Sequence, residues 1–334
     1  MLALNSDHFL EMLYAVSWAG GVVVPLNTRW SIPEIRYALD DAAVKILAVD
    51  SSFEAMVPEL SSELPRTPLL MSGAPGNFTS TETLITESAE VPEVLRGGDD
   101  VSGIFYTGGT TGRSKGVMLT HANHVTNSIQ LAGLMHLPAD VTYLHAAPMF
   151  HIADALCIYM VTTIGGRHVI VPRFDPALVA EAIEAHGITD LLLVPTMIQM
   201  LLDHLATHPR ELATLRRLYY GASPIPEATL FRLFEALPRC AATQLYGQTE
   251  AAPMLTILDA KYHVKDGPHA GRLRSAGRAI SCIELKIVDE NDREVPRGVV
   301  GEVLARGPNI MKGYWGMPEQ TAVTLRGGWL HTGD

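Results

Sequence analysis

Short apolar runs alternate with stretches of helical periodicity up to about residue 250. Short apolar runs bounded by turn residues are typical of buried strands, and apolar positions spaced three and four apart are typical of amphipathic helices. This pattern predicts strands at 22–24, 45–49, 101–106, 116–119, 143–147, 190–194, 216–220 and 242–246. It predicts helices at 8–19, 31–41, from 120 onward, 175–186, 196–206 and 226–236. Strands that alternate with helices favour an α/β fold with parallel sheets.

Two of these helices begin with capping signals. Ser31 and Glu34 have the spacing of a capping box, in which the glutamate side chain reaches back to the first residue. Asp175 followed by Pro176 places an N-cap before a proline at the first helical position. Both signals predict a helix start at these residues.

The pattern changes after about residue 260, where helical periodicity fades. Apolar residues at 283–288 and 301–306 predict two strands, with a turn over 289–292. We therefore expect a small antiparallel β unit in this part of the chain. Residues 57–98 are rich in Ser, Thr, Pro and Gly, which predicts a loop with at most one short strand.

Composition narrows the class of protein without identifying a function. The chain has 334 residues, of which 47% are hydrophobic and 18% charged, as is typical of globular proteins with a sizeable core. Its formal net charge of -11 argues against nucleic-acid binding and against attachment to anionic membranes. The most apolar run, 155–164, is too short to span a bilayer, and the chain starts without a basic leader. We expect a cytoplasmic protein with no integral membrane contact.

Cysteine and histidine give no indication of a metal site. The three cysteines lie far apart and their odd number leaves no paired framework, which indicates free thiols in a reducing compartment. The histidines near the middle of the chain lack the spacing of metal ligands. We interpret four of them as surface or cap residues: His121, His124, His136 and His145.

The strongest local feature is the segment 106–116, which combines glycines, threonines, a serine and two cations. Glycines let backbone amides approach an anion closely, hydroxyls add donors, and cations neutralise phosphate. The segment is not a Walker A loop, because Gly112 is followed by Arg113. A flexible surface turn, or the phosphate loop of a kinase, are the alternatives.

This segment resembles the phosphate loop of the adenylate-forming superfamily, which includes acyl-CoA synthetases, aryl-CoA ligases, luciferases and peptide-synthetase adenylation domains. The family loop reads Tyr-Thr-Ser-Gly-Thr-Thr-Gly-x-Pro-Lys-Gly. The chain departs from it at Gly108 and Ser114, which replace the usual Ser and Pro. Further segments resemble the family's motifs in the family's order: 148–151, 221–224, 246–250, 301–303, 313–315 and 329–334.

The resemblance implies a fold with two mixed, mostly parallel β-sheets flanked by helices, plus a small antiparallel β-barrel-like subdomain. We predict a first α/β subdomain at 1–140, a second at 141–260 and the β subdomain at 261–334. Family members carry a C-terminal lid domain after the Thr-Gly-Asp motif and further units before residue 1. We expect both to be missing, and we expect the chain to bind AMP or ATP weakly and to turn over poorly.

The resemblance also implies roles for the loop residues. The phosphates would be held by Thr107, Gly108, Gly109, Thr110, Thr111, Gly112 and Lys115. The adenine would lie between the Tyr246 ring, with Gly247 beside it, and the backbone of Gly221, Ala222 and Ser223. Thr249 would donate to the α-phosphate, Glu250 would hold Mg²⁺, and Asp334 would bind the ribose hydroxyls. His151 would lie near the substrate carboxylate and gate its pocket.

The implied reaction uses ATP, Mg²⁺ and coenzyme A. A small carboxylic acid would attack the α-phosphate to give acyl-AMP and pyrophosphate, and a thiol of coenzyme A or of a carrier-protein phosphopantetheine would then displace AMP. A pocket wall of apolar residues favours a fatty or arylalkanoic acid; the residues expected there are Val194, Pro195, Met197, Met200, Pro253 and Met254. A truncated protein that binds nucleotide without efficient catalysis is the alternative.

Overall fold

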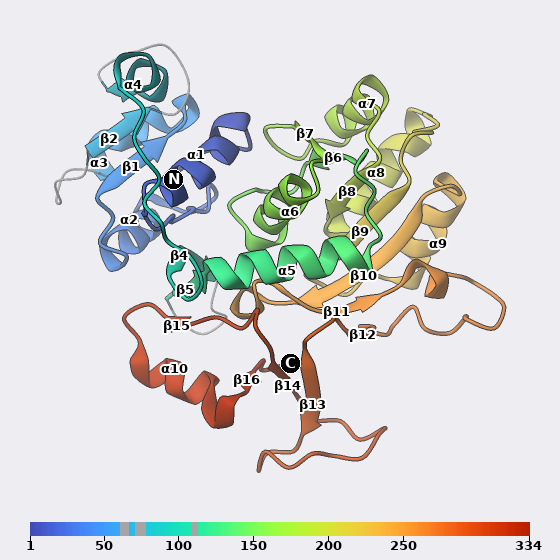
Figure 1. Ribbon diagram of the computed structural model, residues 1–334. Coiled ribbons are helices and arrows are strands. Elements are labelled where there is room, and N and C mark those ends of the chain that lie inside the picture. The colour runs from blue at the N-terminus through green and yellow to red at the C-terminus, as the bar shows by residue number, and fades with distance from the viewer. Residues whose placement is uncertain (61–66, 71–77, 108–112) are drawn as a thin grey trace.

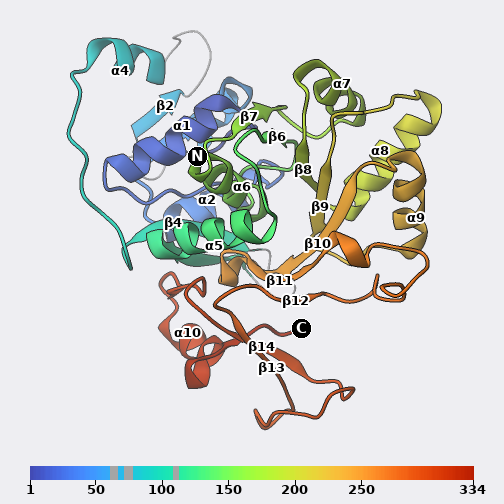
Figure 2. The same ribbon diagram turned by 45° about the vertical axis from the view of Figure 1, so that its right-hand side comes forward.

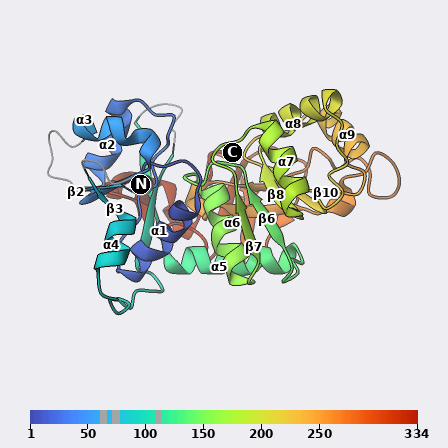
Figure 3. The ribbon, with the colours of Figure 1, turned by 90° about the horizontal axis from the view of Figure 1, so that it is seen from above.

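The computed structural model describes residues 1–60, 67–70, 78–107 and 113–334 (Figure 1). It has the expected α/β fold, in which a large, mostly parallel sheet lies beside a second mixed sheet and a small antiparallel one. Figure 3 shows the N-terminal elements and the large sheet next to each other, with the long helix α5 (His121–Leu134) extending along both. The boundaries at 140 and 260 remain predictions.

The large sheet has seven strands in the order β12-β11-β10-β9-β8-β6-β7. Five of them are parallel: β6 (Thr142–His145), β7 (Arg167–Ile170), β8 (Asp190–Leu193), β9 (Arg217–Gly221) and β10 (Ala241–Gly247). Two antiparallel strands, β11 (Met254–Leu258) and β12 (Arg278–Ala279), extend its edge. The parallel strands bring their carboxyl ends to one edge, where ligands bind in open α/β sheets.

Helices cover both faces of this sheet (Figure 2). One face packs against α7 (Pro176–His186), α8 (Pro195–Thr207) and α9 (Glu227–Ala236), and the other against α5 and α6 (Ile152–Thr163). Strand β8 shows why both faces need cover, because Leu191 and Leu193 enter the first core cluster and Leu192 enters the second. A strand buried on both sides is expected to be continuously apolar.

The second sheet is continuous although its strands come from distant segments. Strands β1 (Ile46–Val49), β2 (Thr67–Leu70) and β3 (Thr79–Ser80) are parallel. Strands β4 (Val101–Thr107), β5 (Lys115–Thr120) and β15 (Gly313–Tyr314) are antiparallel. Leu2 pairs with Val49, Val23 pairs with Gly103, and the Met1 amine donates to Val24, so the extended segments at 1–2 and 23–26 join the two halves. Helices α1 (Asp7–Trp18) and α2 (Ile32–Asp41) belong to this part.

The remaining elements are short. The small antiparallel sheet contains β13 (Glu284–Val288), β14 (Glu302–Arg306) and β16 (Leu330–His331). Helix α10 (Pro318–Thr324) lies between β14 and β16 in the chain. Single turns of 3₁₀ helix lie at η1 (Ser51–Met56), η2 (Thr249–Ala251), η3 (Ala260–Tyr262) and η4 (Arg326–Gly328). Within the described residues, no helix is long and apolar enough to cross a membrane.

The helix starts agree with the capping signals, and one loop prediction is wrong. The Ser31 amide donates to Glu34 at 2.8 Å, and Asp175 accepts from the amides of Ala177 and Leu178. The segment 57–98 contains more structure than a loop with at most one strand, namely α3 (Val57–Leu60), β2, β3 and α4 (Thr81–Glu87). Helix α4 starts with a Ser80 cap and buries none of its residues. Its sequence therefore has no apolar stripe from which a helix could have been predicted.

Candidate functional site

The carboxyl ends of β9 and β10 lie side by side, and each ends in a glycine that the packing requires. Gly221 pairs with Leu245 across the two strands. A Cβ on Gly221 would lie 2.2 Å from the Leu245 carbonyl oxygen, and a Cβ on Gly247 would lie 1.9 Å from the Pro253 carbonyl oxygen. Any other side chain would force these backbones apart, so both glycines keep this edge closely packed. Ala222 and Ser223 follow as exposed residues, with Ala222 at φ 65°.

Tyr246 connects this edge to the last residue of the chain. Its hydroxyl donates to a carboxylate oxygen of Asp334 at 2.8 Å. Partial burial, together with this carboxylate, raises the pKa of Tyr246 to about 12, so the phenol stays neutral at physiological pH. The Asp334 carbonyl accepts from the Val303 amide at 3.0 Å, which fixes Asp334 beside β14. The structure thus brings together Tyr246 and Asp334, which are 88 residues apart.

A chain of polar contacts links the hairpin of β4 and β5, here called the phosphate hairpin after its sequence motif, to Glu250. The Lys115 ammonium, at the start of β5, donates to the Tyr314 hydroxyl at 3.3 Å and lies 4.3 Å from the centre of its ring. The Tyr314 hydroxyl in turn donates to Oε1 of Glu250 at 2.8 Å. Glu250 is 8% exposed. The hairpin and the segment 246–250 therefore face each other, as a shared nucleotide site requires.

The segment 307–315 holds these two parts together through its backbone and one asparagine. The Asn309 amide donates to the carbonyls of Ala251 and Met254, at 2.6 and 2.7 Å. The Met311 amide donates to the Glu250 carbonyl at 2.8 Å. On the hairpin side, the amides of Lys312 and Trp315 donate to carbonyls of β5. Sequence analysis noted residues 313–315 only as a motif and gave no role to Asn309 or Tyr314.

Thr249 and Thr107 lie on the two sides of this arrangement. Thr249 opens the 3₁₀ turn η2, and its hydroxyl makes no hydrogen bond with any described residue. Thr107 ends β4 and pairs with Lys115 across the hairpin. The other loop residues expected to hold phosphate lie outside the described residues: Gly108, Gly109, Thr110, Thr111 and Gly112.

Glu250 fits the requirements of a magnesium ligand. Mg²⁺ prefers oxygen ligands and in nucleotide sites usually takes one or two carboxylates together with phosphates and water. Oε1 of Glu250 accepts from a neutral hydroxyl, and Oε2 has no hydrogen bond among the described residues. Glu250 is therefore a carboxylate that no described cation contacts directly, and it keeps an oxygen free for an ion.

His151 lies at the start of α6, apart from this group. It is the N-cap residue, its ring is exposed, and the ring centre lies 4.4 Å from that of Phe150. Desolvation by surrounding atoms, and secondly the positive charge of Arg29, lower the pKa of His151. Within the described part of the chain, no hydrogen bond or ring contact joins it to Glu250 or Tyr246. Its role toward a carboxylate stays a prediction.

Two of the four histidines interpreted as surface or cap residues are buried, so that interpretation is wrong for them. His145 is fully buried and its Nδ1 lies 2.8 Å from Oδ2 of Asp154, while its Nε2 lies 2.9 Å from Nδ1 of His168. His124 is 3% exposed and stacks on Tyr159. Both lie in the layer formed by α5, α6 and the sheet, where apolar neighbours on either side exclude water.

The residues expected to form the acid pocket do not gather at one wall. Met197 packs in the core cluster of α7, α8 and α9, whereas Met254 packs in the cluster on the other face of the sheet. Met200 is half exposed. Because Met197 and Met254 pack on opposite faces of the sheet, alternation along the sequence could not show which residues share a cavity.

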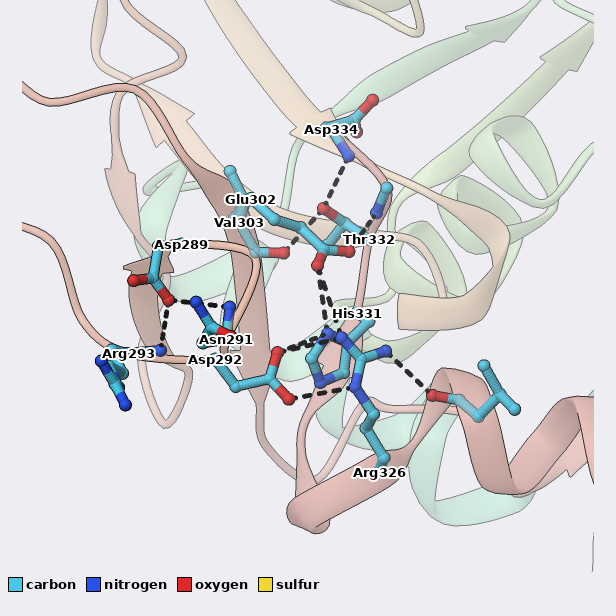
Figure 4. A network of polar contacts seen from close by, with 12 residues as sticks. Asp289, Asn291, Asp292, Arg293, Glu302, Val303, Arg326, His331, Thr332 and Asp334 are labelled. Atoms are coloured by element: carbon cyan, nitrogen blue, oxygen red, sulfur yellow. Dashed lines mark hydrogen bonds and ion pairs between the residues drawn. The ribbon is translucent and has the colours of Figure 1, made fainter.

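An exposed network of charges holds the end of the chain (Figure 4). Arg326 donates to both carboxylate oxygens of Asp292, at 2.9 and 3.1 Å. His331 contacts Glu302 at 3.1 Å, and Glu302 accepts from the Gly333 amide at 2.9 Å. Asp292, Glu302 and His331 have ligand atoms within 4.8 Å of one another, but the Arg326 cation already pairs with Asp292. We assign the network to fixing β16 and Asp334.

Comparisons with known proteins identify the family of the chain. The family model of AMP-binding enzymes matches residues 1–315. A feruloyl-CoA synthase of Amycolatopsis sp. is 36% identical over 335 residues, and the medium/long-chain-fatty-acid–CoA ligase FadD8 of Mycobacterium tuberculosis is 34% identical over 347. Both alignments cover 100% of this chain, but only 64% and 59% of these relatives.

Solved structures give the same result. ATP-bound MatB from Rhodopseudomonas palustris superposes with a TM-score of 0.86 at 31% identity, covering 100% of this chain and 64% of that one. MenE from Bacillus subtilis, in complex with the acyl-adenylate intermediate OSB-AMP, superposes with a TM-score of 0.86 at 26% identity and the same coverage. The chain therefore spans about 59–64% of the length of the relatives named here. It belongs to the family of AMP-binding enzymes.

Proposed function

We propose that the protein activates a small carboxylic acid with ATP to an acyl-AMP and then transfers the acyl group to the thiol of coenzyme A. The observation that carries this proposal is the contact chain from Lys115 through Tyr314 to Glu250. It brings the phosphate hairpin and the Tyr246–Glu250 segment to one place, at the carboxyl edge of the large sheet. A triphosphate can lie there with its purine beside Tyr246.

In this proposal the nucleotide is bound from both sides. Lys115 and the hydroxyl of Thr107 hold the β- and γ-phosphates, with the amides and hydroxyls of 108–112 assigned by their motif alone. The Tyr246 ring and the Gly221–Ser223 backbone enclose the adenine. Asp334, which already accepts one hydrogen bond from Tyr246, takes the ribose hydroxyls. Its neighbour Val303 fixes it in position.

The first step joins two anions, so electrostatics decide its rate. A carboxylate oxygen of the acid attacks the α-phosphorus, the bond to the β-phosphate oxygen breaks, and pyrophosphate leaves. Bound Mg²⁺ would supply positive charge to the phosphate oxygens. Glu250 would hold that ion, while Thr249 donates to the α-phosphate and Lys115 neutralises charge on the leaving group. Donors fixed before the reaction need no reorganisation in the transition state.

The second step forms the thioester. The thiol sulfur attacks the acyl carbonyl carbon, the bond to the AMP oxygen breaks, and AMP leaves with the electron pair. Coenzyme A is our choice of thiol because two relatives named above are a feruloyl-CoA synthase and a fatty-acid–CoA ligase. A carrier-protein phosphopantetheine is the second choice, since a fatty acid–[acyl-carrier-protein] ligase of Streptomyces coeruleorubidus is also similar, at 30% identity.

We propose an aromatic or fatty acid as the substrate, in the cytoplasm. The support comes from the relatives, whose names refer to feruloyl, fatty-acyl and 2-succinylbenzoyl groups. His151 and the neighbouring Phe150 would lie near the acid. All three cysteines are free, which is consistent with a reducing compartment.

Acid-dependent exchange of labelled pyrophosphate into ATP tests this function. Ferulic, octanoic and 2-succinylbenzoic acids are compared, with no acid as the control and with thin-layer separation of AMP from ADP. We expect exchange with at least one acid and formation of AMP. Formation of ADP would instead identify a kinase. Binding of ATP without exchange would identify a nucleotide-binding protein without chemistry.

A further inference from the structure

The hydroxyl of Tyr314 lies between two opposite charges. Its oxygen accepts from the Lys115 ammonium at 3.3 Å and donates to Oε1 of Glu250 at 2.8 Å. The same ammonium lies 4.3 Å from the ring centre, within the range of a cation–π contact. Tyr314 is 4% exposed and Glu250 is 8% exposed. Both charged groups are thus satisfied by one neutral side chain.

A direct ion pair is the obvious competing arrangement. An ammonium and a carboxylate attract each other strongly where water is scarce, and each would then neutralise the other. In that state Lys115 would be less available to a phosphate and Glu250 less available to a cation. A tyrosine hydroxyl donates and accepts at once, so it can satisfy both groups without removing either charge.

The protein holds Tyr314 firmly in this position. The Tyr314 amide donates to Oγ1 of Thr321 at 2.9 Å, and the Trp315 amide donates to the Gly116 carbonyl at 2.7 Å. Gly313 has φ 146°, and a Cβ there would lie 2.6 Å from Cγ2 of Thr321. The backbone thus approaches Thr321 as closely as only glycine permits. The backbone of Tyr314 is thus fixed, and its buried ring packs in a cluster with Phe105, Val117 and Leu119, which restrains the ring beside Lys115 and Glu250.

We propose that Tyr314 is a positioning residue that keeps Lys115 and Glu250 from pairing directly, so that both remain ready for a polyphosphate and its magnesium ion. The proposal rests on the proposed function, because it assigns Lys115 to phosphate and Glu250 to the metal. Loss of the hydroxyl alone leaves the ring but removes both hydrogen bonds. Lys115 and Glu250 then pair, and Mg·ATP must break that pair to bind.

The test measures the affinity of the protein for ATP by calorimetry at increasing Mg²⁺ concentrations. Tyr314→Phe is expected to raise the Mg²⁺ concentration that gives half-maximal ATP binding by about tenfold. Lys115→Gln removes the cation that would capture Glu250. In the Lys115→Gln background, Tyr314→Phe is therefore expected to leave the Mg²⁺ requirement within about twofold of the single variant.

Tyr219→Phe is the matched control. It also removes a buried tyrosine hydroxyl that donates to a carboxylate, here Asp190 at 3.0 Å, and it lies outside the proposed nucleotide site. We expect its Mg²⁺ requirement to equal that of the wild type. If Tyr314→Phe does not fold, Lys115→Arg gives a second test, because the longer guanidinium can reach past the hydroxyl to Glu250 and should also raise the Mg²⁺ requirement.

Three results would overturn the inference. They are an unchanged Mg²⁺ requirement in Tyr314→Phe, an equal increase in the presence and absence of Lys115, and an equal increase in Tyr219→Phe. The last two would give Tyr314 a structural role only. If the wild type shows no Mg²⁺-dependent ATP binding, the proposed function itself is wrong, and this result is separate from the other three.

Discussion

Two buried carboxylates, Asp190 and Glu250, lie at opposite ends of the parallel strands and are treated very differently. Asp190 begins β8 and is fully buried. It accepts two hydrogen bonds from Arg217, one from Tyr219 at 3.0 Å and one from Thr189 at 2.6 Å. Glu250 follows the carboxyl end of β10, and a single neutral hydroxyl is its side-chain partner among the described residues.

This difference indicates that Asp190 stabilises the fold, whereas Glu250 remains available to a ligand. A buried charge is stable when a cation and several donors surround it, as at Asp190. Such a group has no capacity left for another partner. Glu250 has one oxygen without a described partner and lies at the sheet edge where ligands bind. The comparison predicts that disturbing Asp190 reduces stability, whereas disturbing Glu250 reduces binding and chemistry.

The largest expected effect follows from removing the cation beside Asp190. Arg217→Met leaves a buried carboxylate without its charge partner and is expected to lower the free energy of unfolding by about 3–5 kcal/mol. Urea denaturation followed by circular dichroism measures this loss. ATP affinity of the folded fraction should stay unchanged, because Arg217 is at the amino end of β9.

The double variant Asp190→Asn, Arg217→Met is the control for this prediction. Removing both charges leaves no uncompensated ion, so a large part of the lost stability should return. A double variant as unstable as Arg217→Met would show that packing around the arginine, not its charge, supports Asp190.

The second prediction concerns Glu250. Glu250→Gln keeps an oxygen that can accept from Tyr314 but removes the charge for Mg²⁺, and is expected to slow acid-dependent pyrophosphate exchange by about 10²–10³-fold. The melting temperature should stay close to the wild-type value. Glu181→Gln, an exposed change on α7, is the matched control and should have no effect on exchange. A large loss of stability with unchanged exchange would reverse the roles that the comparison assigns.

The sequence predicted the parts of this comparison that depend on local pattern. Strands were correctly predicted at 216–220 and 242–246, and in the structure they pair and each ends in a glycine. The motif at 246–250 then marked Glu250. Its partner Tyr314 is 64 residues away, and Lys115 is 199 residues from Tyr314, so no local spacing could reveal these contacts.

Two buried features, helix α6 and the partner of Asp190, could not be predicted from the sequence. Helix α6 (Ile152–Thr163) was not predicted, because most of its residues are buried and no polar face marks a period of 3.6. Asp190 could be placed at the start of a strand, but its arginine comes from the next strand of the sheet. Buried polar pairs of this kind form only after the sheet order is fixed.

His124 can be compared with Asp190 and Glu250, because it is a buried ionisable group too, but it has no polar partner in the described parts of the chain. Burial, and then His121, lower the pKa of His124 to about 3. Between about pH 6.5 and 3, His124 is therefore protonated in the unfolded state but neutral in the folded state. The free energy of unfolding consequently falls as the pH falls through about this range. His124→Phe keeps a ring stacked on Tyr159 and removes this dependence.

Unfolding experiments at two pH values measure this effect. Between pH 7 and pH 5 the wild type is expected to lose about 2 kcal/mol more unfolding free energy than His124→Phe. His136→Gln changes an exposed histidine in a turn and is the control, so it should keep the pH dependence of the wild type. Equal pH dependence in the wild type and His124→Phe would mean that His124 is already charged in the folded protein.

The smallest expected effect concerns the exposed network of Figure 4, where Asp292 pairs directly with Arg326. Glu250, by contrast, has a neutral hydroxyl as its partner. Contact with Arg326 lowers the pKa of Asp292, but both groups are open to solvent and their attraction is screened. Arg326→Gln is expected to shift the melting temperature by no more than about 2 °C, and the shift should vanish in 1 M salt. The Glu302–Gly333 hydrogen bond remains and still holds the end of the chain, so ATP affinity should change little. A loss of ATP affinity as large as that of Glu250→Gln would show that this charge network, and not the neutral hydroxyl, controls the site.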